Sequence, residues 1–372
     1  MTARTRKGIK ITAIVLLSLI GAFVLAAAGY VVYVVAEYDR IDDGEVLAVT
    51  GSAAGDKLQT GTTYSVLTYN IGFGAYTPDF SFFMDSGEML DGTVVTGKYG
   101  KAIDKAHVEG AIAGAIGEIT AQNTDFVLLQ EVDVDADRSY HIDQQRAIGD
   151  ALLPNGYQTT FAVNFHSAYL MYPLGDHHGK TTAGMATYSK FGIAEAVRRQ
   201  YPLDTGFAKF FDLDRCFVVH RIDVSGGKQL VLINSHMSAY DEGGTIREQQ
   251  LQMLKGVMRE EYEKGNYVIV GGDFNHELAD SLGTFATEQK TPTWAYPLTS
   301  EMLGEGFRVE ASKEGTGTCR AAEIPYEKGV NYLTVLDGFL VSENVETVAI
   351  CNVDTDFRWS DHNPVRYEFR LK

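Results

Sequence analysis

The feature that most constrains this chain is an apolar segment close to its N-terminus. The 26 residues from Ile11 to Ala36 carry no charged side chain, and about 20 apolar residues are enough to cross a bilayer as a helix. The segment has no polar face, which argues against a core helix of a soluble domain. We therefore expect a transmembrane helix over residues 11–36.

A cleaved signal peptide is the alternative interpretation of this segment. The apolar region of a signal peptide spans about 7 to 15 residues and ends in small residues at the cleavage site. Ala26, Ala27 and Ala28 offer such residues, but the apolar sequence continues beyond them to Val35. We favour the membrane anchor for this reason.

The charges on either side of the segment predict its orientation. A basic tail, residues 1–10, precedes it with four Lys and Arg residues and no acid, whereas acidic residues follow it from Glu37. Basic flanks stay in the cytoplasm, so we expect the chain from residue 37 onward to lie outside the cell membrane. The whole chain has a net charge of −17, which leaves −21 for this outer part. A domain this acidic is poorly suited to binding nucleic acid through counterion release.

The outer part is expected to contain a stalk, residues 37–62, and one domain, residues 63–372. Strand-length apolar runs recur throughout the domain, whereas clear helical periodicity occurs only over residues 108–121 and 245–262. Many strands and few helices favour two packed sheets flanked by helices. The expected strands are Ser65–Ile71, Phe126–Val132, Tyr157–Val163, Met185–Ser189, Phe217–Val224, Gln229–His236, Tyr267–Gly271, Leu336–Val341 and Val365–Phe369.

Polar side chains stand at or near the ends of several of these strands. A carboxylate placed directly after a buried strand, as Glu131 is, destabilises the fold unless it is paired or bound to a metal. Each such residue alone is compatible with a turn, but their recurrence predicts one convergent polar site at a rim of the sheets. The residues are Asn70, Glu131, His236, Asp273, Asn275, Asp337, Asp361 and His362.

Six segments around these residues, LTYNIGFG, LLQEVD, INSHMS, GGDFN, LDGFLVS and WSDHNPV, resemble the endonuclease/exonuclease/phosphatase superfamily in this order. The resemblance covers roughly residues 63–372. It implies an α/β fold, a four-layered α/β sandwich of two mainly antiparallel sheets flanked by helices. It also implies an enzyme that cleaves phosphoesters with a divalent metal. Because the superfamily includes nucleases, inositol polyphosphate phosphatases and sphingomyelinases, the resemblance gives a reaction class and no substrate.

The resemblance implies a metal site with Glu131 as the principal ligand and with Asn70 and Asp361 beside it. Oxygen ligands suit Mg²⁺, for which Mn²⁺ can substitute. An acidic cluster would repel a phosphodiester unless a cation intervened, so the physical argument also requires a metal. Zinc is disfavoured because the sequence has no suitable Cys or His spacing. We expect the adjacent His177 and His178 to lie in a solvated turn.

The resemblance further implies five catalytic residues. Asp273 would activate the attacking water, and Asn275 would donate to a phosphoryl oxygen as charge develops. His362 would assist the attack, with Asp337 holding its imidazole ring. His236 would contact the phosphate or assist departure of the leaving group.

Three further residues are candidate substrate contacts. Arg138 can clamp a phosphate through its planar guanidinium, or it can pair with a neighbouring aspartate such as Asp133. His166 and Tyr169 belong to a long loop that could cover the substrate.

Three functions stay open on this pattern. The first is a single-pass, membrane-anchored, extracellular Mg²⁺-dependent phosphodiesterase that acts on a phospholipid headgroup or a similar surface phosphoester. The second is an extracellular nuclease, and the third is a non-catalytic surface binding module, against which the intact set of site residues argues. The sequence shows no obligate protein partner. Its three cysteines are too few for a disulfide scaffold, although one pair plus a free thiol is compatible with them.

Overall fold

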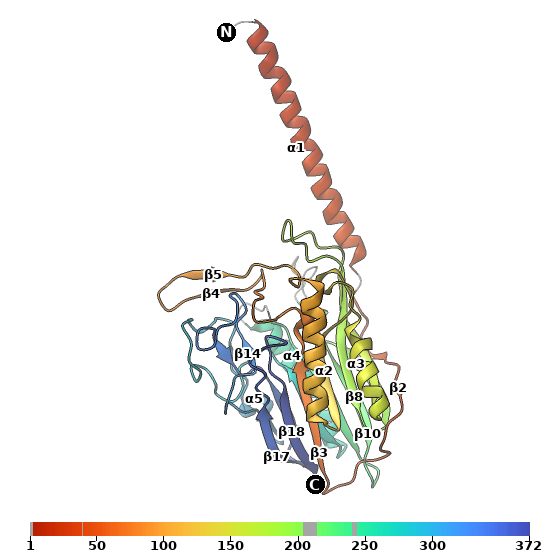
Figure 1. Ribbon diagram of the computed structural model, residues 1–372. Helices are drawn as coiled ribbons and strands as arrows, with labels where there is room; N and C mark the ends of the chain where they lie inside the picture. The colour runs from red at the N-terminus through yellow and green to blue at the C-terminus, as the bar shows by residue number, and fades with distance from the viewer. Residues whose placement is uncertain (1–2, 39, 204–213, 240–243) are drawn as a thin grey trace.

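The computed structural model describes residues 3–38, 40–203, 214–239 and 244–372. A long helix, α1 (Ala3–Glu37), projects from a body of two stacked sheets (Figure 1). The helix is exposed all round from Ile11 to Gly29. Within the described residues it is the only helix long and apolar enough to cross a membrane. The basic tail is part of this helix from Ala3 onward.

Two seven-stranded sheets form the body, and each has one parallel pair, β11 with β12 and β3 with β6, among antiparallel neighbours. The first sheet has the order β1 (Glu45–Val46), β9 (Ile193–Gln200), β10 (Cys216–Asp223), β11 (Gln229–His236), β12 (Tyr267–Asp273), β16 (Asp337–Ser342) and β13 (Phe307–Glu310). The second has the order β17 (Val345–Asn352), β18 (Val365–Leu371), β3 (Thr63–Asn70), β6 (Phe126–Ala136), β8 (Thr181–Ser189), β7 (Gln158–His166) and β2 (Thr50–Gly51).

Alternation along the strands produces a four-layered structure. In β6, Phe126 and Leu128 face the core between the sheets, whereas Val127 and Leu129 face the core under the helices, because successive side chains of a strand point to opposite faces. Helices α2 (Lys105–Gln122) and α3 (Gln144–Leu152) cover the second sheet, and α4 (Thr245–Glu263) covers the first. The predicted fold is confirmed.

Short elements connect the layers. They are α5 (Ser300–Leu303), the hairpin β4 (Ser86–Glu88) and β5 (Val94–Thr96), the pair β14 (Cys319–Arg320) and β15 (Leu333–Thr334), and the 3₁₀ turns η1 (Gly72–Gly74), η2 (Asp137–Ser139) and η3 (Leu153–Asn155). All nine expected strands are present, whereas α3, β9, β13, β17 and the shorter elements were not predicted. Strands β9 and β17 carry charged or exposed residues at several positions, which weakens their apolar pattern.

The segment expected to be a stalk, residues 37–62, lies against the body. Strand β1 pairs with β9, β2 pairs with β7, and Leu58 is fully buried in the core between the sheets. Because backbone groups of this segment pair with strands of both sheets, it cannot act as a flexible spacer. The expectation that residues 37–62 form a stalk is corrected. Helix α1 consequently ends directly at the body.

The point where α1 joins the body identifies one end of the sheets. The carboxylate of Asp43, just after α1, accepts a hydrogen bond from Gln200 N at 2.8 Å. Gln200 is paired with Cys216, which is paired in turn with His236 at the end of β11. The C-terminus lies at the opposite end of the body, away from α1 (Figure 1). The strand ends that carry the predicted site residues thus face the same side as α1.

Candidate active site

Strand register brings the predicted residues together at this end of the sheets. The parallel pairing of β11 and β12 sets His236 beside Asp273, and the antiparallel pairing of β12 and β16 sets Asp273 opposite Asp337. In the second sheet, Asn70 ends β3 beside Gln130 of β6. Asp361 and His362 lie just before β18, separated from it by Asn363 and Pro364.

Glu131 stands in a β-bulge of β6. Leu129 pairs with Ala186 and Val132 with Gly184, so β6 has one residue more than β8 between these pairs. The φ angle of Glu131 is 55°, a left-handed conformation that is costly for a residue other than glycine. A bulge redirects the side chain it contains, and here the Glu131 carboxylate accepts a hydrogen bond from Asn70 Nδ2 at 3.1 Å.

One carboxylate oxygen, Asp273 Oδ2, is the centre of the cluster. Asn70 Nδ2 donates to it at 3.0 Å, and it lies 3.6 Å from His236 Nε2 and 3.7 Å from His362 Nε2. The other oxygen, Oδ1, accepts the backbone N–H of Asn275 at 2.9 Å. Asp273 is therefore held rigidly, with one oxygen directed toward the two imidazoles.

The imidazole of His362 is oriented by Asp337, because Nδ1 of His362 lies 2.8 Å from Asp337 Oδ2. Both side chains are buried. Burial alone lowers the pKa of an imidazole, but the carboxylates of Asp337 and Asp273 hold the pKa of His362 well above its usual value. A cationic His362 with Nε2 toward the site is the result.

The second imidazole is in the opposite state. His236 is buried, and its Nε2 lies 2.5 Å from Arg215 Nη1 and 3.9 Å from Glu131 Oε1. Burial lowers the pKa of His236 well below its usual value, and the positive charges of Arg215 and His362 lower it further. The site therefore contains one neutral and one charged imidazole.

The carboxylates of the cluster fit a divalent cation. Burial raises the pKa of both Glu131 and Asp361, and the charge of Asp361 raises that of Glu131 further. Buried acids that repel each other in this way are stabilised by a cation between them. Ligand atoms of Asp273, Asp337 and His362 also lie within 4.8 Å of one another and form a second candidate ligand group.

Two amides of the cluster have defined hydrogen bonds. Asn70 points its Nδ2 at the carboxylates, and its Oδ1 accepts the N–H of Gly72 at 3.0 Å. Asn275 has a left-handed φ of 48°, and its Nδ2 donates to Met237 O at 2.9 Å. The roles of Asn70 as a metal ligand and of Asn275 as a phosphoryl donor stay predictions.

Of the two alternatives for Arg138, the structure shows the ion pair. Its Nε and Nη2 donate to the two oxygens of Asp133 at 3.1 and 2.8 Å, and its guanidinium stacks 3.8 Å from the ring centre of Phe73. Arg138 and Asp133 are both buried. This pair occupies the Nε–Nη2 edge of the guanidinium, and the role of Arg138 as a phosphate contact stays a prediction.

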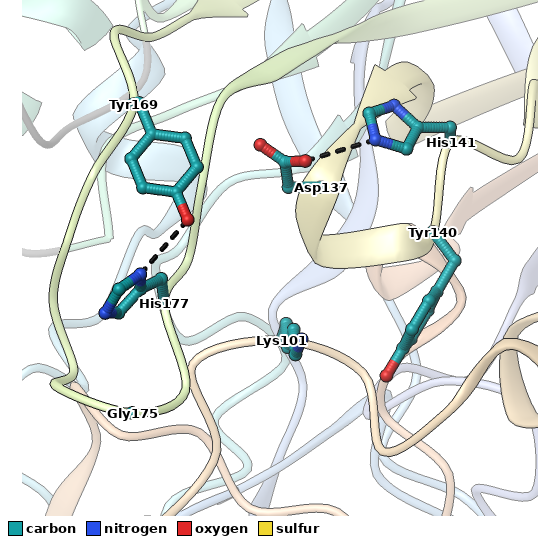
Figure 2. A pocket seen from close by; sticks show the side chains of 7 residues that line it. All are labelled: Lys101, Asp137, Tyr140, His141, Tyr169, Gly175 and His177. Atoms are coloured by element: carbon teal, nitrogen blue, oxygen red, sulfur yellow. Dashed lines mark hydrogen bonds and ion pairs between the residues drawn. The ribbon is translucent and has the colours of Figure 1, made fainter.

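Of the other two candidate contacts, His166 ends β7 and Tyr169 lies on the β7–β8 loop, residues 167–180. His166 is exposed, and the hydroxyl of the half-exposed Tyr169 lies 3.0 Å from His177 Nδ1 (Figure 2). The neighbouring His178, which we expected in a solvated turn, is instead buried, with its Nδ1 2.7 Å from Gly100 O. That expectation is wrong because the loop folds back on the body.

Arg215 and the polar layer beneath the site were not among the predicted site residues. Arg215 directly precedes the buried strand β10, and this position was the available signal. Below the site, Gln130 Nε2 donates to Asn234 Oδ1 at 2.8 Å and so joins the two sheets. Asn234 in turn donates to Leu129 O at 3.2 Å. The three cysteines, Cys216, Cys319 and Cys351, are free thiols.

Several solved structures share this architecture. An endonuclease/exonuclease/phosphatase from Beutenbergia cavernae superposes with a TM-score of 0.54 at 19% identity, over 83% of this chain and 72% of that chain. ANGEL2, a 2′,3′-cyclic phosphatase in complex with adenosine-2′,3′-vanadate, gives a TM-score of 0.53 at 15% identity, over 87% and 98%. TDP2 from Caenorhabditis elegans gives 0.52 at 14% identity, over 84% and 76%. At these identities the likeness shows the fold.

Sequence comparison gives the family. An inositol phosphosphingolipids phospholipase C from Schizosaccharomyces pombe is 26% identical over 172 residues, which are 39% of this chain and 41% of the relative. The chain thus matches about two fifths of the length of that relative. The profile of the Endonuclease/Exonuclease/phosphatase family matches residues 67–362, which include all eight residues of the cluster. The chain belongs to the endonuclease/exonuclease/phosphatase family and is a phosphoesterase.

Proposed function

We propose that the protein is a membrane-anchored, extracytoplasmic phosphodiesterase that hydrolyses a phospholipid headgroup. The observation that carries the proposal is that the strand ends with the cluster residues and the end of α1 share one side of the body, as the pairing from Gln200 through Cys216 to His236 shows. With α1 as a membrane span, that side faces the bilayer. A phosphoester in the adjacent leaflet is then the substrate nearest to the cluster.

The sequence comparison supports the same substrate class. The relative from Schizosaccharomyces pombe is named as a phospholipase C that acts on inositol phosphosphingolipids. A phospholipase C cleaves on the glycerol or ceramide side of the phosphate, which is phosphodiester hydrolysis. The net charge of −21 after residue 36 further disfavours a broad grip on nucleic acid.

The geometry suggests a division of roles in this reaction. Asp273 Oδ2, between the two imidazoles, would orient the attacking water and accept its proton. His362, kept cationic by Asp337, would stabilise the charge that develops on the phosphoryl oxygens. Arg215, next to His236, would add a second fixed positive charge.

Glu131 and Asp361 would hold the metal, with Asn70 beside them, and we propose Mg²⁺ because the ligands are oxygens. The bound ion would neutralise the substrate phosphate and the buried carboxylates. The domain boundaries that go with this proposal are a basic tail (1–10), a membrane span (11–36), a connecting segment (37–62) and a catalytic domain (63–372).

The test is a substrate panel on the full chain in detergent micelles with Mg²⁺. The panel contains sphingomyelin, inositol- and glycerol-based phospholipids, plasmid DNA, RNA and bis-p-nitrophenyl phosphate. We expect release of a phosphorylated headgroup, and a loss of about 10² to 10⁴-fold in rate for His362→Ala. Cleavage of DNA or RNA without any lipid hydrolysis would favour the extracellular nuclease. A fully active His362→Ala variant would refute the proposed site.

A further inference from the structure

The β7–β8 loop presents an apolar tip on a fixed base. Exposed fractions are 83% for Leu174, 64% for Tyr172 and 42% for Met171. Exposed apolar groups that lie together on a soluble face mark a contact surface. These three residues form what we call the apolar tip.

The base of the loop is tied to the body by several hydrogen bonds. Leu170 and Gly179 exchange two backbone hydrogen bonds of 3.1 and 3.0 Å, and Asp176 Oδ2 accepts the N–H of Gly100 at 2.8 Å. His178 is buried against Gly100 O, and Leu170 is buried beside Phe165. Both ends of the loop are thus anchored to the body, whereas the tip between them is exposed. A loose attachment of the loop therefore does not explain the exposure of the tip.

Three successive contacts run from the base of the loop along α1. Lys180 Nζ lies 3.7 Å from a carboxylate oxygen of Glu37, Tyr169 N donates to the hydroxyl of Tyr33 at 3.0 Å, and Met171 N donates to the hydroxyl of Tyr30 at 3.1 Å. The Tyr30 hydroxyl also donates to Tyr169 O at 3.1 Å. The loop therefore rises beside the helix from Glu37 to Tyr30, as Figure 1 shows for the segment next to the base of α1.

The level of Tyr30 on α1 coincides with a membrane boundary. Twenty residues lie between Ile11, which follows the basic tail, and Tyr30, both included. At about 1.5 Å per residue they span about 30 Å, the thickness of a hydrocarbon core. Tyrosines are enriched at such boundaries. The sequence is apolar for six more residues, to Ala36, so Tyr30 lies at or within this boundary.

We infer that the apolar tip, Met171, Tyr172 and Leu174, inserts into the outer lipid leaflet beside α1. The occupant of this surface is the bilayer, because the tip continues the apolar surface of the membrane span. A single helix leaves a body free to tilt and turn above the membrane, whereas a second insertion fixes the face that carries the cluster against the lipid. The net charge of −21 rules out general electrostatic attraction to an anionic surface, so the insertion is apolar.

The loop also borders an open pocket of about 320 Å³ lined by Lys101, Asp137, Tyr140, His141, Tyr169, Gly175 and His177 (Figure 2). In Figure 2 the contact between Tyr169 and His177 closes the loop on one side of this pocket, and the pair of Asp137 and His141 lies on the other. Tyr169 and His177 of the loop thus line the pocket, whereas Met171, Tyr172 and Leu174 are not part of its lining.

Fluorescence labelling tests the insertion without any enzyme assay. The full chain carries Cys351→Ser, which removes the exposed thiol, and a single new cysteine labelled with a polarity-sensitive dye, after reconstitution into phosphatidylcholine vesicles. For Leu174→Cys we expect blue-shifted emission and quenching by nitroxide lipids. For the matched control Val348→Cys, 38% exposed on β17, we expect the emission of water and no quenching. Equal emission and quenching at the two positions would overturn the inference.

Activity provides a second readout, which rests on the proposed lipid substrate. Leu174→Asp should lower hydrolysis of a vesicle lipid by at least about tenfold, because an aspartate is strongly disfavoured in lipid. Its rate on soluble bis-p-nitrophenyl phosphate and the activity of Val348→Asp should equal those of the wild type. An unchanged vesicle rate for Leu174→Asp contradicts the inference. If no lipid is hydrolysed by the wild type, the proposed substrate fails, and the labelling result still decides the insertion.

Discussion

Replacing Arg138 by methionine separates the two roles that the sequence allows for this residue. The substitution keeps much of the apolar volume and removes the positive charge. It leaves the Asp133 carboxylate, which is fully buried, with the hydroxyl of Ser139 at 2.8 Å as its remaining side-chain donor. Breaking a buried ion pair on one side costs about 3–5 kcal/mol. Loss of the guanidinium stacked on Phe73 adds to this cost.

The expected loss is large against a typical total stability of about 5–15 kcal/mol. It corresponds to a decrease of about 5 to 8 °C in Tm for a domain of this size. The measurement is denaturation of the full chain in detergent, followed by the fluorescence of its two tryptophans, Trp294 and Trp359, both outside α1. At temperatures well below the melting range, the rate at which Arg138→Met hydrolyses bis-p-nitrophenyl phosphate should change little, although its stability is lower.

A double variant provides the control. Asp133→Asn combined with Arg138→Met removes the unpaired buried charge and should recover most of the lost stability. The stability of Arg138→Lys should lie between those of the wild type and Arg138→Met, because lysine cannot bond both carboxylate oxygens in one plane. The reasoning is refuted if Arg138→Met unfolds like the wild type and loses its activity. That result would assign the guanidinium to the substrate phosphate.

Three further outcomes are expected. First, the free energy of unfolding should fall as the pH drops below 6.5. Burial lowers the pKa of native His220 to about 4 and that of native His178 to about 3, whereas these histidines bind protons near pH 6.5 in the unfolded chain. Each of the two groups therefore lowers the free energy of unfolding by about 1.4 kcal/mol per pH unit. In urea titrations His220→Gln should reduce this slope by about one proton, and an unchanged slope in this variant would contradict the argument. Second, Asp337→Asn should lower kcat by about 10² to 10⁴-fold at temperatures where the variant is folded, since the imidazole of His362 keeps a hydrogen bond and loses the charge that holds it cationic; an unchanged kcat in the folded variant would contradict the role of Asp337. Third, addition of Mg²⁺ should raise the Tm of wild-type protein from which metal has been removed by a chelator. In the absence of metal, Glu131→Gln should melt at a higher temperature than the wild type, and Mg²⁺ should change its Tm little. A full Mg²⁺ response in this variant would remove Glu131 from the metal site.

The sequence by itself determined the family, the two-sheet architecture and the identity of the eight cluster residues. It could do so because these properties are local: a buried strand shows as a run of apolar residues, and a functional side chain placed directly after that strand stands out against it. The same reasoning finds α1, whose uncharged length is a property of consecutive residues. The pattern fails at β9 and β17, where charged and exposed residues interrupt the run.

The tertiary structure alone decided which groups meet. The pairing of Arg138 with Asp133, the approach of Arg215 to His236, and the contacts of the β7–β8 loop with α1 join residues through folding of the backbone. Arg138 had several acidic neighbours in the sequence, and a bidentate geometry selected one of them. The charge states of His236 and His362 likewise depend on burial and on carboxylates brought from other strands, because electrostatic energies follow distance in space and not separation along the chain.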